Sequence, residues 1–279
     1  MALQLPSGRR LAINIGVDFD AHSAWMGTVG VTSPGFLSRG EFDAVVGVPR
    51  VLRALSEYGV VGNFFTPTHT MATFPQSFEL VLESGHEISA HGCWHEPIPT
   101  LDPDEESRLL DLQIAEHEKH VGKRPHGYRS PAWDFTEHTL GLLEAAGFAW
   151  DSSLMGRDFE PYRPRPIFLD YEEGNRFGAP SSVLEFPVSW HLDDFPVTEF
   201  IPGKNAGMES PETIYHRWKD HLDFAYERVP NGVVTLTVHP QAIGRAQYLL
   251  MFERFLRYAS ELEGVWFTDL STLASHWTD

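Results

Sequence analysis

Residues 10–20 of the chain, RLAINIGVDFD, decide its fold class. The stretch is an apolar run of strand length, and it ends in two aspartates, Asp18 and Asp20. A short apolar run of this kind is consistent with a fully buried strand, which is the type that parallel sheets contain. We therefore expect a buried strand that delivers two carboxylates at its carboxyl end.

The same pattern recurs along the chain, and segments with helical spacing of apolar residues separate the strands. Further strands are expected at 60–67, 86–91, 125–131, 148–154, 183–190, 232–240 and 265–270. Helices are expected at 47–59, 75–85, 102–121, 136–147, 211–228 and 246–263. This alternation, with short connections bounded by glycine, predicts parallel strands joined by helical crossovers. About seven or eight such units predict an α/β fold with a distorted TIM-like (β/α) barrel, complete or incomplete.

Two connections are longer than a barrel needs. Residues 21–46 and residues 155–182 either cover the functional site, closing it over something small, or form contacts between subunits. The chain has no internal repeat and no break in composition, so we expect a single domain over residues 1–279.

Charge and cysteine content narrow the class of protein. The 279 residues include 39 Asp and Glu but only 21 Lys and Arg, which gives a formal net charge of −18. An acidic balance of this size argues against binding to nucleic acid or to an anionic membrane. There is one cysteine, Cys93, and the first residues lack a signal-peptide pattern. We expect a cytoplasmic protein that acts on a small molecule, with no nucleic-acid or membrane partner.

Reactive side chains occur where the expected strands end. His91 and His95 follow the strand at 86–91, in ISAHGCWHEP, and their spacing allows both imidazoles to face one centre. The other side chains of this kind are Asp18, Asp20, Arg129, Asp151 and His239. Because the carboxyl ends of parallel strands lie on one face of the sheet, we expect all of them to converge there.

This set of residues suits metal-assisted hydrolysis. One carboxylate and two imidazoles form an open site for zinc or another divalent ion, which lowers the pKa of water and polarises a carbonyl oxygen. A second carboxylate can take the proton of that water, and a histidine can protonate a leaving nitrogen. Asp18 and His239 suit these two roles. Arg129 would keep the base ionised, and Asp151 would keep the histidine protonated.

Five short motifs, VDFDA, HGCWH, YRSPAW, DSSL and TVHP, occur in the order found in the polysaccharide deacetylases. Residues 10–270 resemble this family, which is the nodulation-type deacetylase domain of carbohydrate esterase family 4. The resemblance implies the distorted barrel of the family. It also implies a site with Asp20, His91 and His95 as metal ligands, Asp18 as general base oriented by Arg129, and His239 as general acid partnered by Asp151.

Two departures from the family pattern indicate a particular branch. The first motif has Asp18-Phe19-Asp20-Ala21 in place of a Thr-Phe-Asp-Asp-Gly type segment, and Gly92 stands where Ser or Thr is usual. Together with residues 38–50, 63–67 and 189–196, these departures are similar to an intracellular branch. That branch includes Helicobacter-type peptidoglycan deacetylase homologues, cyclic imide hydrolases and an allantoinase. The resemblance implies a homo-oligomer, either a dimer or a tetramer.

Several further residues are candidates for the walls of the site. We expect Trp133, Trp190 and Phe65 to line the substrate pocket, although large aromatic side chains are also common in the core. Asp193 and Asp194 either contact substrate or cap turns. Cys93 lies between the two histidines, but a lone cysteine is more often a small buried apolar residue than a ligand.

The function predicted from these features is hydrolysis of a non-peptide C–N bond by a metal-dependent enzyme. We expect ring opening of a small cyclic imide or ureide, with one zinc ion as cofactor, or cobalt, manganese or nickel in its place. The first alternative is N-deacetylation of carbohydrate or peptidoglycan fragments. The second is a non-catalytic homologue that binds a metabolite.

Overall fold

The structure is a computed structural model that describes residues 2–278. An eight-stranded sheet curls through the molecule, and all of its strand pairs are parallel. Its strands are β2 (Leu11–Asp18), β3 (Asn63–Thr66), β4 (Glu87–Ala90), β5 (Gly127–Tyr128), β6 (Trp150–Asp151), β9 (Leu184–Glu185), β10 (Gly232–Val238) and β11 (Val265–Phe267). The order across the sheet is β10-β2-β3-β4-β5-β6-β9, and β11 pairs with the first residues of β2.

The sheet closes into a distorted barrel, as the sequence predicts. The chain after β9 returns to β10, where Asp193 and Thr237 form one isolated parallel bridge. The backbone N–H of Asp194 also donates to the carbonyl oxygen of Thr237, at 3.3 Å. A single bridge is much less than a strand ladder, so the barrel is closed but irregular at this seam.

Strand β2 lies at the centre of the sheet because every one of its residues can be buried. Leu11, Ile13 and their alternate neighbours face outward into the main hydrophobic core under the helices. The opposite face points into the barrel, and Gly16 stands there. A Cβ at this position would lie 2.7 Å from Nη1 of Arg129, so only glycine leaves room for that side chain inside the barrel.

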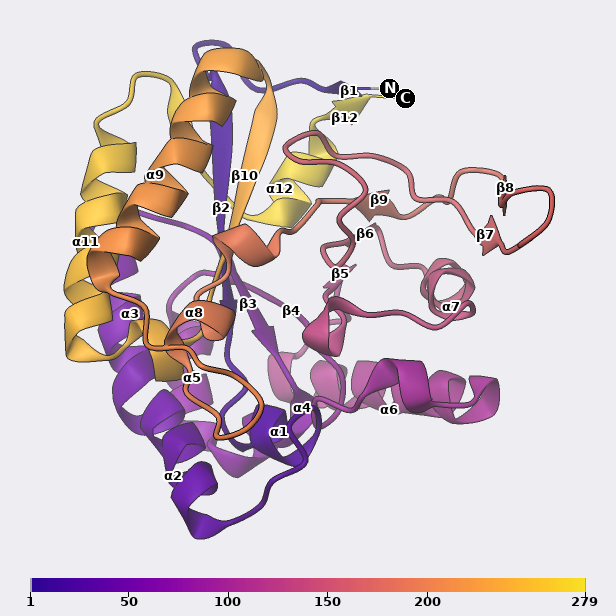
Figure 1. Ribbon diagram of the computed structural model, residues 1–279, viewed down its shortest axis with the longest axis horizontal. Coiled ribbons are helices and arrows are strands. Elements are labelled where there is room, and N and C mark those ends of the chain that lie inside the picture. The colour runs from indigo at the N-terminus through magenta and orange to yellow at the C-terminus, as the bar shows by residue number, and fades with distance from the viewer. Residues whose placement is uncertain (1, 279) are drawn as a thin grey trace.

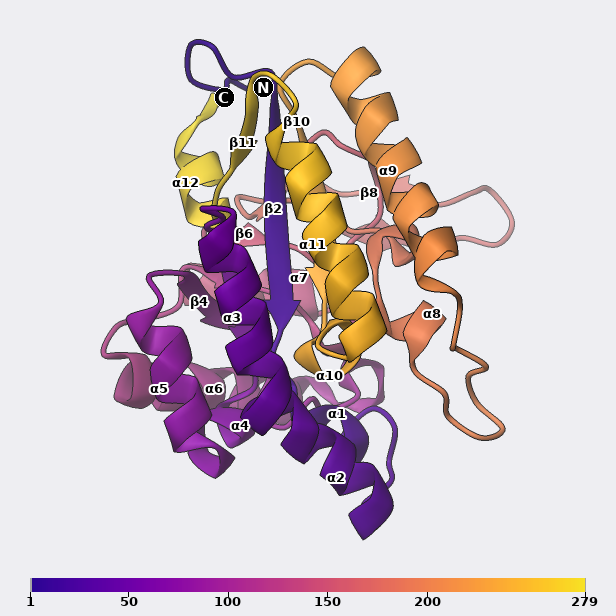
Figure 2. The same cartoon turned by 90° about the vertical axis from the view of Figure 1, so that its left-hand side faces the viewer.

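Helices cover the outside of the barrel, and α3, α9 and α11 lie side by side along β2 and β10 (Figures 1 and 2). The longer helices are α2 (Pro34–Phe42), α3 (Val48–Glu57), α5 (Pro75–Glu83), α6 (Pro103–Val121), α7 (Thr139–Ala146), α9 (Pro211–Arg228) and α11 (Ala246–Ser260). Shorter ones are α1 (His22–Met26), α4 (Thr68–Thr73), α8 (Phe195–Thr198), α10 (Pro240–Ile243) and α12 (Leu270–Ser275). In the part of the chain that is described, no helix has both the length and the apolar character needed to cross a membrane.

The two long connections have different structures. Residues 21–46 fold into α1, α2 and the start of a π-helical segment, Asp43–Gly47, at the carboxyl end of β2 (Figure 1). Residues 155–182 form an irregular excursion with a small hairpin of β7 (Ile167–Phe168) and β8 (Arg176–Phe177), which projects to the right in Figure 1. At the other end of the barrel, β1 (Ala2–Leu3) pairs with β12 (Trp277–Thr278).

Candidate active site

Three strand ends bring the expected metal ligands and acid–base residues together. Asp18 ends β2 and Asp20 follows it, His91 and His95 follow β4, and His239 follows β10. All five side chains are buried. Nε2 of His91 lies 3.4 Å from Oδ1 of Asp20, and Nε2 of His95 lies 3.7 Å from Oδ2 of the same residue. Nε2 of His239 is 3.9 Å from Oδ2 of Asp18, so these groups surround one centre.

The hydrogen bonds of the two histidines leave the right atoms free for a metal ion. Nδ1 of His91 lies 2.7 Å from the carbonyl oxygen of Arg129, which can only accept, so the proton is on Nδ1 and the lone pair is on Nε2. Nδ1 of His95 lies 2.7 Å from Oγ1 of Thr28. Nε2 of His91 and Oδ1 of Asp20 are buried without a hydrogen-bond partner among the described residues. Such an arrangement is typical of a metal centre whose imidazoles are oriented from behind.

For two of the three proposed ligands, Asp20 and His95, electrostatics favour the protonation states that metal ligands need. Burial alone would raise the pKa of Asp20, but the charges of His95, His91 and His239 outweigh it and hold that pKa well below its ordinary value. Burial lowers the pKa of His95 to about 4, so this imidazole is neutral near pH 7. A divalent ion requires an ionised carboxylate and a neutral imidazole, and these two residues provide them.

The backbone at Asp20 is fixed by residues that the sequence did not single out. Ala21 adopts a strained conformation with φ 49° and ψ −121°, and its N–H donates to Oδ2 of buried Asp43 at 2.8 Å. Asp43 begins the π-helical segment. Oγ1 of Thr70 donates to the carbonyl oxygen of Asp20 at 2.5 Å. A π-helical turn is rare and is found frequently at functional sites, so this feature of the folded chain marks the support of the site.

Arg129 contacts Asp18 as the sequence predicts. Its Nη1 donates to Oδ1 of Asp18 at 2.6 Å, and its Nε donates to the carbonyl oxygen of Ser152 at 3.0 Å. The guanidinium carbon lies 3.8 Å from the centre of the Phe65 ring. The arginine is fully buried, so this ion pair is shielded from solvent.

The predicted pairing of His239 with Asp151 is wrong, because the partner is Asp194. Nδ1 of His239 lies 2.8 Å from Oδ1 of Asp194, and the backbone N–H of His239 donates to both oxygens of that carboxylate at 3.0 Å. Asp151 instead accepts from Oγ of Ser153 at 2.7 Å. The seam of the barrel explains the difference, since the bridge between Asp193 and β10 brings Asp194 to His239.

Asp194 also sets the charge of His239. Burial lowers the pKa of this imidazole, but the hydrogen bond to Asp194 and the charges of Asp193, Asp194 and Asp18 raise it well above its ordinary value. His239 is therefore held in its protonated form. The sequence interpreted the acidic pair Asp193 and Asp194 as substrate contacts or as turn caps. It did not predict the contact of Asp194 with His239.

A cavity of about 150 Å³ opens onto this centre. Trp133 and Trp190 form part of its wall, with their ring centroids 4.4 Å apart, and Val29 of the 21–46 connection forms another part. Residues 155–182 do not contribute to the lining. Phe65 was also expected there, but it is fully buried beneath Arg129 and packs on Trp150, so this expectation is wrong.

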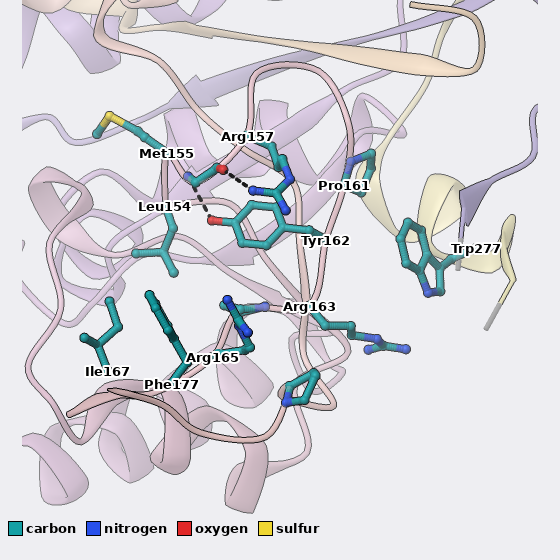
Figure 3. A pocket seen from close by; sticks show the side chains of 13 residues that line it. Leu154, Met155, Arg157, Pro161, Tyr162, Arg163, Arg165, Ile167, Phe177 and Trp277 are labelled. Atoms are coloured by element: carbon teal, nitrogen blue, oxygen red, sulfur yellow. Dashed lines mark hydrogen bonds between the residues drawn. The ribbon is translucent and has the colours of Figure 1, made fainter. Parts of the chain in front are cut away.

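A larger cavity of about 860 Å³ lies elsewhere, between the excursion at 155–182 and the barrel (Figure 3). Arg157, Tyr162 and Arg165 line it, with Trp277 at the far side. None of the expected metal ligands or acid–base residues belongs to this cavity, so the smaller one is the candidate active site despite its size.

Comparison with known proteins identifies the family. The polysaccharide deacetylase family model matches residues 41–150. The chain is 35% identical over 275 residues to the peptidoglycan deacetylase of Helicobacter pylori, covering 93% of this chain and 94% of the relative. It is 36% identical over 284 residues to a peptidoglycan deacetylase-like protein of Gibberella zeae, covering 93% and 84%. The fold and the comparisons define a hydrolase that acts on C–N bonds other than peptide bonds. The chain belongs to the polysaccharide deacetylase family, which confirms the resemblance.

Solved structures agree with this assignment. A crystal structure from Mycobacterium smegmatis described as a polysaccharide deacetylase superposes with a TM-score of 0.84 and 31% identity, covering 99% of this chain and 92% of that one. PuuE allantoinase has a TM-score of 0.80 at 21% identity, covering 98% and 92%, and so shares the fold. Members of this family are metal-dependent, and the Asp20–His91–His95 cluster is a candidate site for the ion. The individual catalytic roles stay predictions.

Proposed function

We propose that the chain removes the acetyl group from N-acetylated carbohydrates, with peptidoglycan fragments as the substrate class. The observation that carries the proposal is that Asp18 and His239 both border a small cavity beside the Asp20–His91–His95 cluster. An acetamido group is small enough for this cavity, while the sugar would stay at its mouth. The two relatives whose names contain peptidoglycan deacetylase support the choice of substrate.

The residues of the chain supply the acid–base chemistry. A divalent ion held by Asp20, His91 and His95 would lower the pKa of water and polarise the amide carbonyl. Asp18, which is paired with Arg129, would accept the proton of the attacking water. His239 then gives its Nε2 proton to the departing nitrogen, while Asp194 holds the ring from the Nδ1 side.

Zinc is the ion we propose, with cobalt, manganese and nickel as alternatives. One carboxylate oxygen and two imidazole nitrogens form a ligand set that all four ions accept, so only metal analysis distinguishes them. We also propose that the protein acts in the cytoplasm, as the sequence led us to expect. Its substrates would then be soluble fragments and not the intact cell-wall polymer.

Ring opening of a small cyclic imide or ureide is the second candidate function. The size of the cavity favours it, since about 150 Å³ is below the roughly 300–1,000 Å³ of pockets for drug-sized ligands. A five- or six-membered ring would fit inside with Trp133 and Trp190 against its face. The same acid–base steps apply, but the nitrogen that leaves stays attached to the product.

Hydrolysis assays with two substrate sets test the proposal. Protein reconstituted with each of the four metals would be given N-acetylglucosamine oligomers and peptidoglycan fragments, or succinimide, hydantoin, dihydrouracil and allantoin. We expect acetate release from the first set, and its loss in Asp18→Asn with the metal content unchanged. Ring opening alone would favour the second candidate. A protein that binds these compounds but turns over neither set would be the non-catalytic homologue.

A further inference from the structure

The catalytic cavity contains one carboxylate that the proposed acid–base steps do not use. Asp193 lines the cavity beside Asp18 and His239, and only 2% of its surface is exposed. The other two carboxylates of the lining have partners or roles, since Asp18 is paired with Arg129 and Asp20 belongs to the metal cluster. Asp193 is therefore the acidic side chain of the lining that is left for the substrate.

The two oxygens of Asp193 have different surroundings. Oδ1 accepts the backbone N–H of Phe195 at 2.8 Å and lies 3.6 Å from Nδ1 of His239. In the described part of the chain, no hydrogen bond reaches the other oxygen, Oδ2. The protein seals Oδ1 of Asp43 away without a partner, but Oδ2 of Asp193 is not sealed in this way. Oδ2 is thus the part of the carboxylate that a molecule in the cavity can reach.

The seam of the barrel holds Asp193 in place before any substrate binds. Its backbone forms the parallel bridge with Thr237 of β10, and the next residue, Asp194, is hydrogen-bonded to His239. A group that is positioned in advance binds its partner at a small cost in conformational entropy. The two neighbouring carboxylates therefore have separate contacts, because Asp194 holds the ring of His239 and Asp193 borders the cavity.

Asp193 lacks donors in the protein alone. Burial raises its pKa to about 7, although the charge of His239 lowers it. A donor from a bound molecule would favour the ionised form of the carboxylate. The wall of the cavity is largely apolar and includes Ala24, Val29, Trp133, Trp190 and Phe195. A substrate with an N–H group that faces Asp193 and apolar parts against this wall would therefore satisfy both.

We propose that Oδ2 of Asp193 accepts the N–H of the amide whose C–N bond breaks. The inference rests on the proposed function and restricts the substrate class to secondary amides, which include acetamido sugars as well as N-unsubstituted imides and ureides. The nitrogen keeps this hydrogen, and the proton from Nε2 of His239 is added to it as the C–N bond breaks. Because the nitrogen becomes more positive in this step, a carboxylate that accepts its N–H stabilises the transition state and turns the lone pair toward His239.

A comparison of substrates with and without the N–H provides the test. The two matched pairs are succinimide with N-methylsuccinimide, and an N-acetylglucosamine oligomer with its derivative methylated on the acetamido nitrogen. In Asp193→Asn, the amide oxygen can keep the bond from the N–H of Phe195, which leaves an NH2 group facing the substrate. The preference in kcat/KM for the N–H member of a pair should therefore fall about 10- to 100-fold, the scale of one hydrogen bond to a charged group.

Asp194→Asn is the matched control. It acts through His239, so it should slow both members of a pair alike and leave the preference unchanged. Zinc content and circular dichroism check that both variants bind metal and stay folded. An equal loss for both members in Asp193→Asn would mean that Asp193 acts only through the charge of His239, and it would overturn the proposal.

Binding measurements separate this proposal from the proposed function. If neither pair is hydrolysed, the proposed function fails. The preference is then taken from the dissociation constants of the two members, measured by calorimetry on the zinc-loaded protein, and the same is done if the N-methyl member reacts too slowly to measure. A preference that Asp193→Asn leaves unchanged overturns the contact, and so does a failure of all four compounds to bind.

Discussion

The two halves of the barrel are built differently. In one half, β10 and β2 have seven and eight residues and pair at seven successive positions, and β3 and β4 continue this regular ladder. In the other half, β5, β6 and β9 have two residues each. The regular half is held by backbone hydrogen bonds, so its residues are placed by the sheet itself.

In the short half, hydrogen bonds between the backbone and side chains hold the chain in place. The backbone N–H of Ser130 donates to Oγ of Ser153 at 2.8 Å, and Ser153 and Leu154 donate their N–H groups to Oε1 of buried Glu185. This network fixes the chain next to Arg129. The two halves therefore contribute different groups to the site. The metal cluster, Asp18 and His239 come from the regular half, and Arg129, which pairs with Asp18, comes from the short half.

The largest effect is expected from a metal ligand of the regular half. Asp20→Asn removes the charge that both histidines face, so affinity for zinc should fall at least about 100-fold and kcat/KM at least about 10⁴-fold. Stability without metal should change little, because Asp20 lies beyond the end of β2. Chelator competition and kinetics measure this, with exposed Asp111→Asn on α6 as control. Unchanged zinc affinity in Asp20→Asn would rule out the proposed ligand set.

The seam between the halves gives the next prediction, which compares two aspartates. Asp194→Asn should lower kcat about 10²–10³-fold, because a positioned general acid contributes on this scale and Asp194 holds His239. Asp151→Asn should lower the free energy of unfolding and reduce kcat less than Asp194→Asn does, since Asp151 belongs to the buried network of the short half. Parallel kinetics and urea unfolding separate the two cases. A larger loss of kcat in Asp151→Asn would return Asp151 to the role that the sequence suggested.

The same contrast explains which parts of the site the sequence could predict. Continuous apolar runs followed by Asp18, Asp20 and His239 predict a buried parallel ladder and one polar face, because strand burial and direction are local properties. The position of Asp194 depends on how the irregular chain after β9 returns to close the barrel, and no local pattern encodes that return. Phe65 was misplaced for a similar reason, since the space that Gly16 leaves for Arg129 is visible only when the strands are side by side.

Removing Arg129, whose charge links the short half to Asp18 of the regular half, should lower the free energy of unfolding. Arg129→Ala leaves Asp18 buried without its partner, and breaking a buried pair in this way costs about 3–5 kcal/mol of unfolding free energy. Adding Asp18→Asn should recover a large share of the loss, because no unpaired charge then remains. Arg108→Ala, which removes an exposed pair with Glu105, is the matched control and should change the free energy of unfolding far less, because water screens an exposed ion pair. Equal costs for the two arginines would mean that the halves are not coupled through this pair.

The smallest effect concerns α6, which packs on β4 of the regular half and on α7 beside the short half. His117 of α6 is fully buried, and neither ring nitrogen has a hydrogen-bond partner in the described part of the chain. Burial lowers its pKa from 6.5 to about 4, so the folded protein keeps it neutral while the unfolded chain takes up a proton below pH 6.5. The free energy of unfolding is therefore unaffected by His117 above pH 6.5 and decreases as the pH falls toward 4. At pH 5.5 the decrease is about 1.4 kcal/mol. Urea unfolding at pH 8 and pH 5.5 should show that His117→Leu removes this part of the decline, whereas exposed His138→Gln should not. An identical decline in His117→Leu would mean that the ring of His117 is charged in the folded protein or that α6 opens before the rest of the molecule unfolds.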